Sequence, residues 1–191
     1  MRFDDGTVMR LYPQTVQDFY LYADKELSDE QMTALRTAAG AMSAKMRAVR
    51  IVASTAVSKK DLEQRLIQKG EDPDQAKDAV QWMSDMKLVD DRAVAEQIVN
   101  RCISKGYGLA RAKQALYEKR IPKQYWEEAL SEYPDQQEAI VSFLRTKLGQ
   151  SKNNRDLKKV IDALIRRGHS YGQVRKAMTV LGLDPIEFWE E

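Results

Sequence analysis

The strongest constraint on this chain is a helical pattern that returns three times at intervals of about fifty residues. The pattern becomes visible when Gly70 is aligned with Arg120 and Gly168. Apolar or small residues then coincide at helical spacing on both sides of the aligned position. Four residues upstream lie Leu66, Leu116 and Leu164, and six residues downstream lie Ala76, Trp126 and Val174. Nine residues downstream lie Ala79, Ala129 and Ala177, and ten residues downstream lie Val80, Leu130 and Met178. Such periodicity is typical of repeat proteins, in which each repeat contacts mainly its neighbours.

This periodicity predicts a mainly α-helical protein with three tandem three-helix repeats in an elongated, curved array. Two local features mark the repeat boundaries. Asp90-Asp91 suits a helix start, where negative charge is favourable, and Pro134-Asp135 interrupts a helical pattern. The expected organisation is an N-terminal segment over 1–27, a first repeat over 28–89, a second repeat over 90–133, and a third repeat with a C-terminal tail over 134–191.

The first repeat also shows where its helices begin and which face they bury. Ser58 is a suitable N-cap and Pro73 a suitable first-turn residue, so two helices are expected to start at these points. The preceding helix carries an apolar stripe at spacings of three and four, which predicts its buried face. That stripe consists of Leu35, Ala38, Ala39, Met42, Met46, Val49 and Val52.

The N-terminal segment does not share the helical pattern. Asp5-Gly6 supplies residues suited to a tight turn, which predicts a short β-hairpin over residues 2–11. Pro13 then favours a helix that continues to about residue 23. Because an isolated two-stranded ribbon is marginal in water, the hairpin is expected to lie on a helix or pair with another strand.

Composition and motif searches argue against most catalytic classes. With 43% hydrophobic and 31% charged residues, the chain is expected to fold around a core. It shows neither a membrane span nor the apolar core of a signal peptide, which predicts a cytoplasmic protein. Cys102 is interpreted as a buried structural thiol, His169 as a surface or turn residue, and Gly106-Tyr107-Gly108 as a helix–helix turn rather than a nucleotide-binding loop. We therefore expect no enzyme activity, no cofactor and no bound metal.

Charge is nearly balanced overall but unevenly distributed along the chain. There are 31 Lys and Arg against 29 Asp and Glu, a formal net charge of +2. Over residues 99–123, however, seven basic residues stand against one acidic residue, and over 145–176 ten stand against two. These stretches occupy equivalent places in the second and third repeats. They predict basic helix faces that contact phosphates or an acidic partner, with a merely solvated face as the alternative for any single residue.

Several short motifs follow one another along the helical repeats. They are Leu88-Val89-Asp90-Asp91, then Lys105-Gly106-Tyr107-Gly108 followed by Arg111, and the repeat ends Gln68-Lys69-Gly70, Glu118-Lys119-Arg120-Ile121 and Arg166-Arg167-Gly168. In their order and spacing, together with the three-helix repeat, residues 40–182 resemble the RecX family of bacterial recombination regulators. The chain departs from the family pattern at Arg120, where glycine is common, and at Val94 and His169, where an aromatic residue is expected.

The resemblance implies a regulator of the RecA recombinase and, through it, of DNA repair, recombination and the SOS response. Members of the family bind RecA and its filament on single-stranded DNA and modulate, mostly inhibit, its ATPase, strand-exchange and coprotease activities. A monomer with weak affinity for single- or double-stranded DNA and no membrane contact is expected. The candidate contacts with RecA or DNA are Arg101, Lys105, Tyr107, Arg111, Lys113, Lys158, Lys159, Arg166 and Arg167.

The alternative is a direct DNA-binding protein. Three-helix units resemble helix-turn-helix modules, whose basic helices contact backbone phosphates. A structural adaptor for another helical protein is a third possibility. Steep salt dependence of binding to DNA alone distinguishes the direct DNA-binding protein from the other two.

Overall fold

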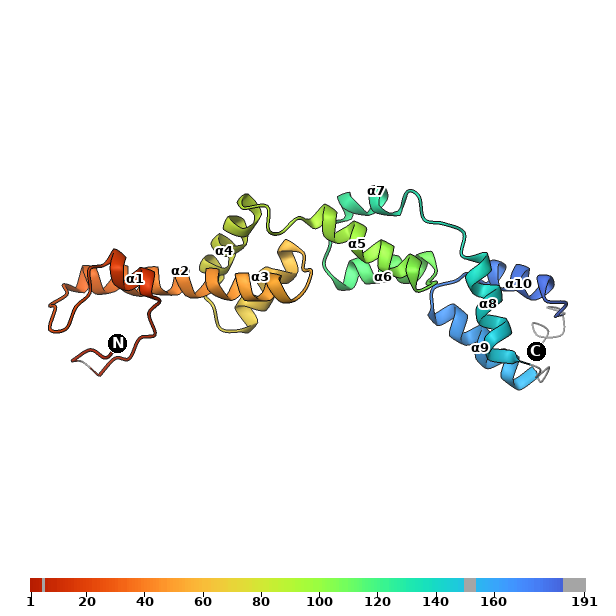
Figure 1. The fold of residues 1–191 in the computed structure, drawn as a ribbon, viewed down its shortest axis with the longest axis horizontal. Helices are drawn as coiled ribbons and strands as arrows, with labels where there is room; N and C mark the ends of the chain where they lie inside the picture. The colour runs from red at the N-terminus through yellow and green to blue at the C-terminus, as the bar shows by residue number, and fades with distance from the viewer. Residues whose placement is uncertain (5, 150–153, 184–191) are drawn as a thin grey trace. The chain divides into compact units, whose positions relative to one another are not determined.

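The computed structural model describes residues 1–4, 6–149 and 154–183, and over these residues the protein is mainly helical and contains no β-strand (Figure 1). The chain divides into two compact units, Met1–Asp90 and Asp91–Glu191. Three features of the sequence interpretation lie outside the described residues, namely Asp5 of the expected turn, Lys152 of the second basic stretch and the tail beyond residue 183.

The first unit contains α1 (Pro13–Asp18), α2 (Asp29–Ser54), α3 (Lys59–Gln68) and α4 (Pro73–Asp85). A capping box starts α2, because the Ser28 hydroxyl accepts from the Gln31 N–H and the Gln31 side chain accepts from the Ser28 N–H. The expected helix starts are confirmed, since Ser58 caps α3 and Pro73 opens α4.

The helices α3 and α4 lie against α2 (Figure 1), and one hydrophobic cluster joins them to its C-terminal half. The predicted buried stripe of α2 is partly wrong, because Val49 is exposed and Met42 and Met46 are only half-buried. The residues of α2 that are buried are Leu35, Ala39, Ala44, Ala48 and Ile51. Small alanine side chains on this face allow α4 to pack closely against α2. A ranking by side-chain hydrophobicity alone places these alanines below the larger methionines.

The predicted N-terminal β-hairpin is not supported. Only one isolated antiparallel bridge forms, between Arg2 and Val8. The chain closes a tight loop in which the Phe3 N–H donates to the Thr7 carbonyl at 2.9 Å, but it does not extend into strands. The helix expected to reach residue 23 is also shorter, since α1 ends at Asp18 and Tyr20 turns the chain with a φ of 48°.

The second unit contains two groups of helices, each around its own hydrophobic cluster. The first group is α5 (Asp91–Ser104), α6 (Leu109–Glu118), the 3-10 turn η1 (Lys123–Tyr125) and the short α7 (Trp126–Leu130). The second group is α8 (Gln137–Leu148), α9 (Asn154–Arg166) and α10 (Tyr171–Val180). Buried leucines such as Leu116 and Leu164 anchor the two clusters, each contributing about 1.5–3 kcal/mol by burial.

The three positions that align in the sequence form the same kind of turn. Gly70, Arg120 and Gly168 all have positive φ angles, of 89°, 52° and 87°. In each turn the following N–H donates to the carbonyl of the buried leucine, from Glu71 to Leu66 at 3.1 Å and from Ile121 to Leu116 at 3.0 Å, for example. This is the Schellman motif, in which a left-handed residue ends a helix.

Candidate partner-binding surface

The motif Lys105-Gly106-Tyr107-Gly108 forms the turn between α5 and α6. Gly106 has a φ of 61° and its N–H donates to the Ile103 carbonyl at 2.9 Å, while the Tyr107 N–H donates to the Cys102 carbonyl at 3.0 Å. These two hydrogen bonds close another Schellman motif, for which glycine is suited because it lacks a Cβ. Gly108 then stands at the N-cap of α6 in an extended conformation.

This turn interlocks with the turn that carries Arg166-Arg167-Gly168. The Gly108 N–H donates to the Arg167 carbonyl at 2.9 Å, and the Ala110 N–H reaches the Gly168 carbonyl at 3.4 Å. In the opposite direction, Arg167 Nη2 donates to the Lys105 carbonyl at 2.7 Å. We call this contact, made by residues 105–110 and 167–169, the turn joint. It ties the first helix group of the second unit to the second.

His169 completes the turn joint from a buried position. Its Nε2 lies 3.0 Å from the Gly106 carbonyl oxygen, so Nε2 carries the proton and donates. Among the described residues Nδ1 has no hydrogen-bond partner. Burial, which disfavours the charged ring, lowers the pKa of His169, and the nearby Arg167 charge lowers it further against the raising effect of the Gly106 hydrogen bond. The imidazole is therefore a neutral structural group.

The Arg167 guanidinium lies between two aromatic rings. Its Cζ is 4.9 Å from the centre of the Tyr107 ring and 4.8 Å from that of Phe143. Tyr133 stabilises the turn that contains Tyr107, because its hydroxyl donates to the Tyr107 carbonyl at 2.7 Å. Burial raises the pKa of Tyr133 to about 12, so the hydroxyl stays a donor. Arg167 and Tyr107 are thus engaged within the protein.

Beside the turn joint lies a cavity of about 250 Å³, which we call the Arg cavity. Its lining residues are Tyr107, Arg111, Phe143, Ala163, Arg166 and Arg167. Arg111 Nη1 donates to Glu118 Oε1 at 3.0 Å, and this hydrogen bond is the main reason that the pKa of Glu118 is lowered. The Arg166 side chain makes no hydrogen bond or ion pair within the described part of the chain.

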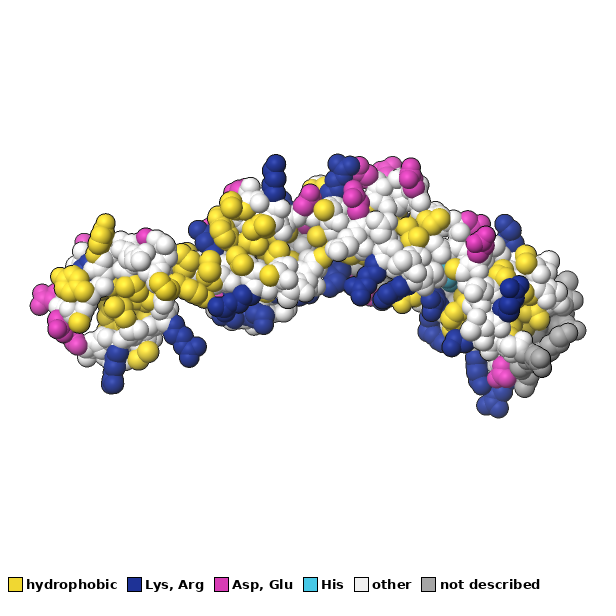
Figure 2. Space-filling model, in the orientation of Figure 1, with side chains coloured by type: hydrophobic (Ala, Val, Ile, Leu, Met, Phe, Trp, Pro, Cys, Tyr) yellow, Lys and Arg dark blue, Asp and Glu magenta, His cyan; other side chains and the backbone are white. Residues whose placement is uncertain are grey.

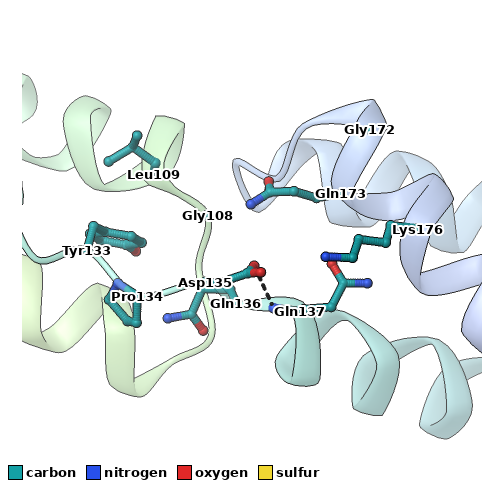
Figure 3. Close-up of a pocket in the computed structure, with 10 residues that line it drawn as sticks. All are labelled: Gly108, Leu109, Tyr133, Pro134, Asp135, Gln136, Gln137, Gly172, Gln173 and Lys176. Carbon is teal, nitrogen blue, oxygen red and sulfur yellow. Dashed lines mark hydrogen bonds between the residues drawn. The ribbon is translucent and has the colours of Figure 1, made fainter.

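A second cavity of about 380 Å³ lies between the start of α6, the segment before α8, and α10 (Figure 3). The Asp135 carboxylate accepts at 3.1 Å from the N–H of Gln137, the first residue of α8. The Gln137 side-chain amide is buried and has no hydrogen-bond partner among the residues that the structure describes. Gln137 and Lys176 both line this cavity (Figure 3).

The remaining candidate contacts lie at the surface of the second unit. Figure 2 shows Lys and Arg side chains along the lower edge of this unit and Asp and Glu side chains over α7 on the opposite edge. The exposed candidates are Arg101 on α5, Lys105 in the α5–α6 turn, Lys113 on α6, and Lys158, Lys159 and Arg166 on α9. Lys159 lies 3.3 Å from the Asp156 carboxylate, and the side chains of the other five make no hydrogen bond or ion pair within the described residues.

Cys102 is buried with a pKa raised mainly by its burial, in line with the structural role expected of it. Over residues 1–4, 6–149 and 154–183, no group of three or more His, Cys, Asp and Glu is arranged to hold a metal ion. No helix in that same part of the chain is long and apolar enough to cross a membrane.

Comparison with known proteins gives a consistent result. Residues 90–130, which contain the Lys105–Gly108 motif and Arg111, match the family model described as RecX, second three-helix domain. The regulatory protein RecX of Clostridioides difficile is 24% identical over 184 residues, covering 93% of this chain and 86% of that protein. RecX of Vibrio parahaemolyticus is 24% identical over 141 residues, covering 72% of this chain and 91% of its own length. Together these matches support the RecX family for this chain.

Solved structures of RecX proteins share the fold. A crystal structure of regulatory protein RecX matches with a TM-score of 0.68 and 19% identity, covering 93% of this chain and 91% of that one. RecX from Lactobacillus salivarius matches with a TM-score of 0.64 and 20% identity, covering 76% and 98% respectively. The mainly helical architecture predicted from the sequence is therefore confirmed as that of RecX structures.

The turn joint gives a physical role to the RecX-like motifs. Gly108 and Gly168 belong to these motifs, and a Cβ built on Gly108 would lie 2.0 Å from the Gly168 carbonyl oxygen. Sequence reasoning missed Phe143 and Glu118 as neighbours of the candidate arginines. Glu118 was visible as the one acidic residue of the basic stretch over 99–123. Phe143 lies on another helix, and no sequence signal connects it to Arg167.

Proposed function

We propose that this RecX-family chain binds the RecA recombinase, principally its filament on single-stranded DNA, and inhibits its ATPase, strand-exchange and coprotease activities. The proposal is that it acts by binding and not by catalysis. The observation that carries it is the match of residues 90–130 to the second three-helix domain of RecX. Relatives whose full length is largely covered carry the name regulatory protein RecX, which supports the same role.

The contacts are assigned to the basic edge of the second unit. Five exposed side chains supply positive charge and do not pack in the core. They are Arg101, Lys105 and Lys113 on the first helix group and Lys158 and Lys159 on the second. Arg111 and Arg166 add two guanidinium groups that can bind carboxylates or phosphates in a bidentate manner. Several weak contacts on one chain act together, because each bound group raises the effective concentration of the next.

The decisive experiment titrates the protein into RecA assembled on single-stranded DNA and follows ATP turnover and strand exchange. We expect both activities to fall as the added protein approaches the RecA concentration. The double variant Arg101→Glu with Lys113→Glu reverses two exposed charges and is expected to shift the dose response to higher protein by roughly tenfold. Lys123→Glu with Lys147→Glu makes the same change in net charge outside the candidate set. No effect of the folded wild-type protein at stoichiometric amounts would discard the proposal.

Direct DNA binding is the second candidate, favoured by the exposed basic residues of α6 and α9. It predicts binding to DNA without RecA and a logarithmic dependence on salt, with a slope of about −0.7 per phosphate contacted on single strands. Titrating the protein into labelled single-stranded DNA at several salt concentrations tests this. Effects on RecA that persist where DNA binding is lost favour the recombinase as the partner.

A further inference from the structure

Arg111 at the rim of the Arg cavity already holds a carboxylate from its own helix. Glu118 Oε1 accepts from Arg111 Nη1 at 3.0 Å and from Gln114 Nε2 at 3.3 Å. The side chains of Arg111 and Glu118 are 39% and 48% exposed, respectively. Exposed ion pairs of this kind are weak because water and salt screen them. The pair is therefore easily exchanged for another anion that offers more contacts.

The rest of the Arg cavity offers such contacts. Arg166 is exposed and has no partner within the described residues, so its guanidinium is available. Arg167 is held by the Lys105 carbonyl and by the two aromatic rings, and it fixes the wall next to Arg166. Phe143 and Ala163 give that wall an apolar part. The cavity thus combines two exchangeable guanidinium groups with a surface suited to methylene groups.

We propose that the Arg cavity receives a glutamate or aspartate side chain of a partner protein, and that Glu118 is its internal competitor. The incoming carboxylate takes the place of Glu118 on Arg111 and binds Arg166 as well, while its methylene groups contact Phe143 and Ala163. This inference deepens the proposed function, on which it rests only for the identity of the partner. Glu118 then sets the threshold for binding, because a partner must displace it.

Two observations favour a protein carboxylate over a nucleic-acid phosphate. Arg111 binds a carboxylate in the structure itself, with the geometry of an ordinary charged hydrogen bond. Sites for single-stranded nucleic acid pair a basic groove with aromatic rings on which bases stack. Here Tyr107 and Phe143 each turn a ring face to the Arg167 guanidinium, so these faces are already occupied.

The direct test uses the full-length protein and a hexapeptide of alternating glutamate and leucine, followed by NMR shifts of backbone amides. A peptide with glutamine in place of glutamate, and a single-stranded oligothymidylate, serve as comparison probes. We expect the glutamate peptide to shift amides near Arg111 and Arg166, and Arg166→Gln or Arg111→Gln to weaken its binding at least about fivefold. Glu118→Gln is expected to tighten binding about two- to fivefold, the amount that an exposed pair contributes.

Matched variants separate the cavity from net charge. Lys123→Gln removes one positive charge, and Glu132→Gln removes one negative charge, at exposed positions away from the cavity. Both are expected to leave peptide binding within about twofold of wild type, since screening weakens distant charges. Unchanged binding in Glu118→Gln and in both arginine variants would overturn the proposal. The proposal would also be overturned if oligothymidylate shifted the amides around Arg111 and Arg166 and the peptide did not.

The same variants in the RecA titration distinguish this inference from the proposed function. If Glu118→Gln inhibits RecA at lower concentrations than Glu132→Gln does, the cavity contacts the recombinase. If the peptide binds as expected but the folded wild-type protein has no effect on RecA, the proposed function fails and the carboxylate site stands. If RecA is inhibited equally by wild type and all cavity variants, the site fails and the proposed function stands.

Discussion

Gly108 and Gly168 lie back to back in the turn joint, so closely that a Cβ built on Gly108 would come within 2.0 Å of the Gly168 carbonyl oxygen. The Gly108 N–H makes its hydrogen bond to the Arg167 carbonyl at the same place. Neither backbone can withdraw without losing hydrogen bonds that the turn joint uses. The absence of a side chain at residue 108 is therefore a packing requirement, since its φ of −78° is open to any residue.

Replacing Gly108 with alanine tests this requirement. We expect Gly108→Ala to lower the free energy of unfolding of the second unit by about 1–3 kcal/mol, the usual cost of overpacking. Gly172→Ala is the matched control, because its Cβ would meet only the Ser170 hydroxyl at 4.0 Å. That control lies in α10 and is expected to be neutral or stabilising by up to about 1 kcal/mol. Chemical denaturation monitored by circular dichroism measures both, and equal values would contradict the close approach.

Adjacent arginines allow a similar comparison. Arg167→Ala removes a hydrogen bond to the Lys105 carbonyl and contacts with two aromatic rings, and we expect it to cost about 2–4 kcal/mol of stability. Arg166→Ala, one residue away and exposed, is expected to change stability by less than about 0.5 kcal/mol. Thermal unfolding of the two variants measures the difference. Similar melting temperatures would show that Arg167 does not hold the turn joint together.

The buried imidazole makes the second unit sensitive to acid. Protonation of His169 would add an N–H at Nδ1, which has no acceptor among the described residues, and a charge beside Arg167. Because the folded-state pKa is lowered, the unfolded chain takes up the proton first, near its ordinary value of about 6.5. The contribution of neutral His169 to stability is therefore complete above that value and is lost as the pH falls toward the lower folded-state pKa.

His169→Gln isolates this effect, because a glutamine amide can still donate to the Gly106 carbonyl but does not titrate. We expect the melting temperature of the wild-type protein to fall more steeply than that of the variant between neutral pH and pH 5. Other groups titrate equally in both proteins, so the difference between the two curves reports on residue 169. Parallel curves would mean that His169 is not held in its neutral form.

Arg120 occupies the left-handed position that Gly70 and Gly168 fill in the other two turns. An L-residue pays about 1–2 kcal/mol for this conformation, and glycine loses more conformational entropy on folding. We therefore expect Arg120→Gly to stabilise the second unit by about 0.5–1 kcal/mol relative to Arg120→Ala, which removes the same side chain without relieving the φ angle. Equilibrium unfolding in urea measures the difference. If the alanine variant were the more stable one, the positive φ angle at residue 120 would not strain the chain.

The sequence predicted the helices well because their signals are local. Ser58 and Pro73 start helices as expected, and the spacing of Leu66, Leu116 and Leu164 found three fully buried positions. It failed where packing decides the outcome. Ala44 and Ala48 are buried instead of Val49 because a close helix needs small side chains, and the Asp5-Gly6 pair favours a turn without supplying strands to extend it.

For the candidate site, the sequence identified basic residues but not their neighbours. Lys113 and Lys158 are exposed as a contact role requires, whereas Arg167 and Tyr107 are engaged within the turn joint. The aromatic partner Phe143 comes from α8, and the hydrogen bond that joins Arg167 to Lys105 spans 62 positions along the chain. Long-range contacts of this kind leave no periodic trace in one sequence.

The turn joint also sets the order in which the protein can be completed on the ribosome. The carbonyls of Lys105 and Gly106 are made early, and their partners Arg167 and His169 follow 62 and 63 residues later. Until then water hydrates these carbonyls. The first helix group of the second unit leaves the ribosome without the hydrogen bonds from Arg167 and His169. A fragment that stops before α8 never gains these hydrogen bonds, so the smallest piece worth producing extends from residue 91 through α10.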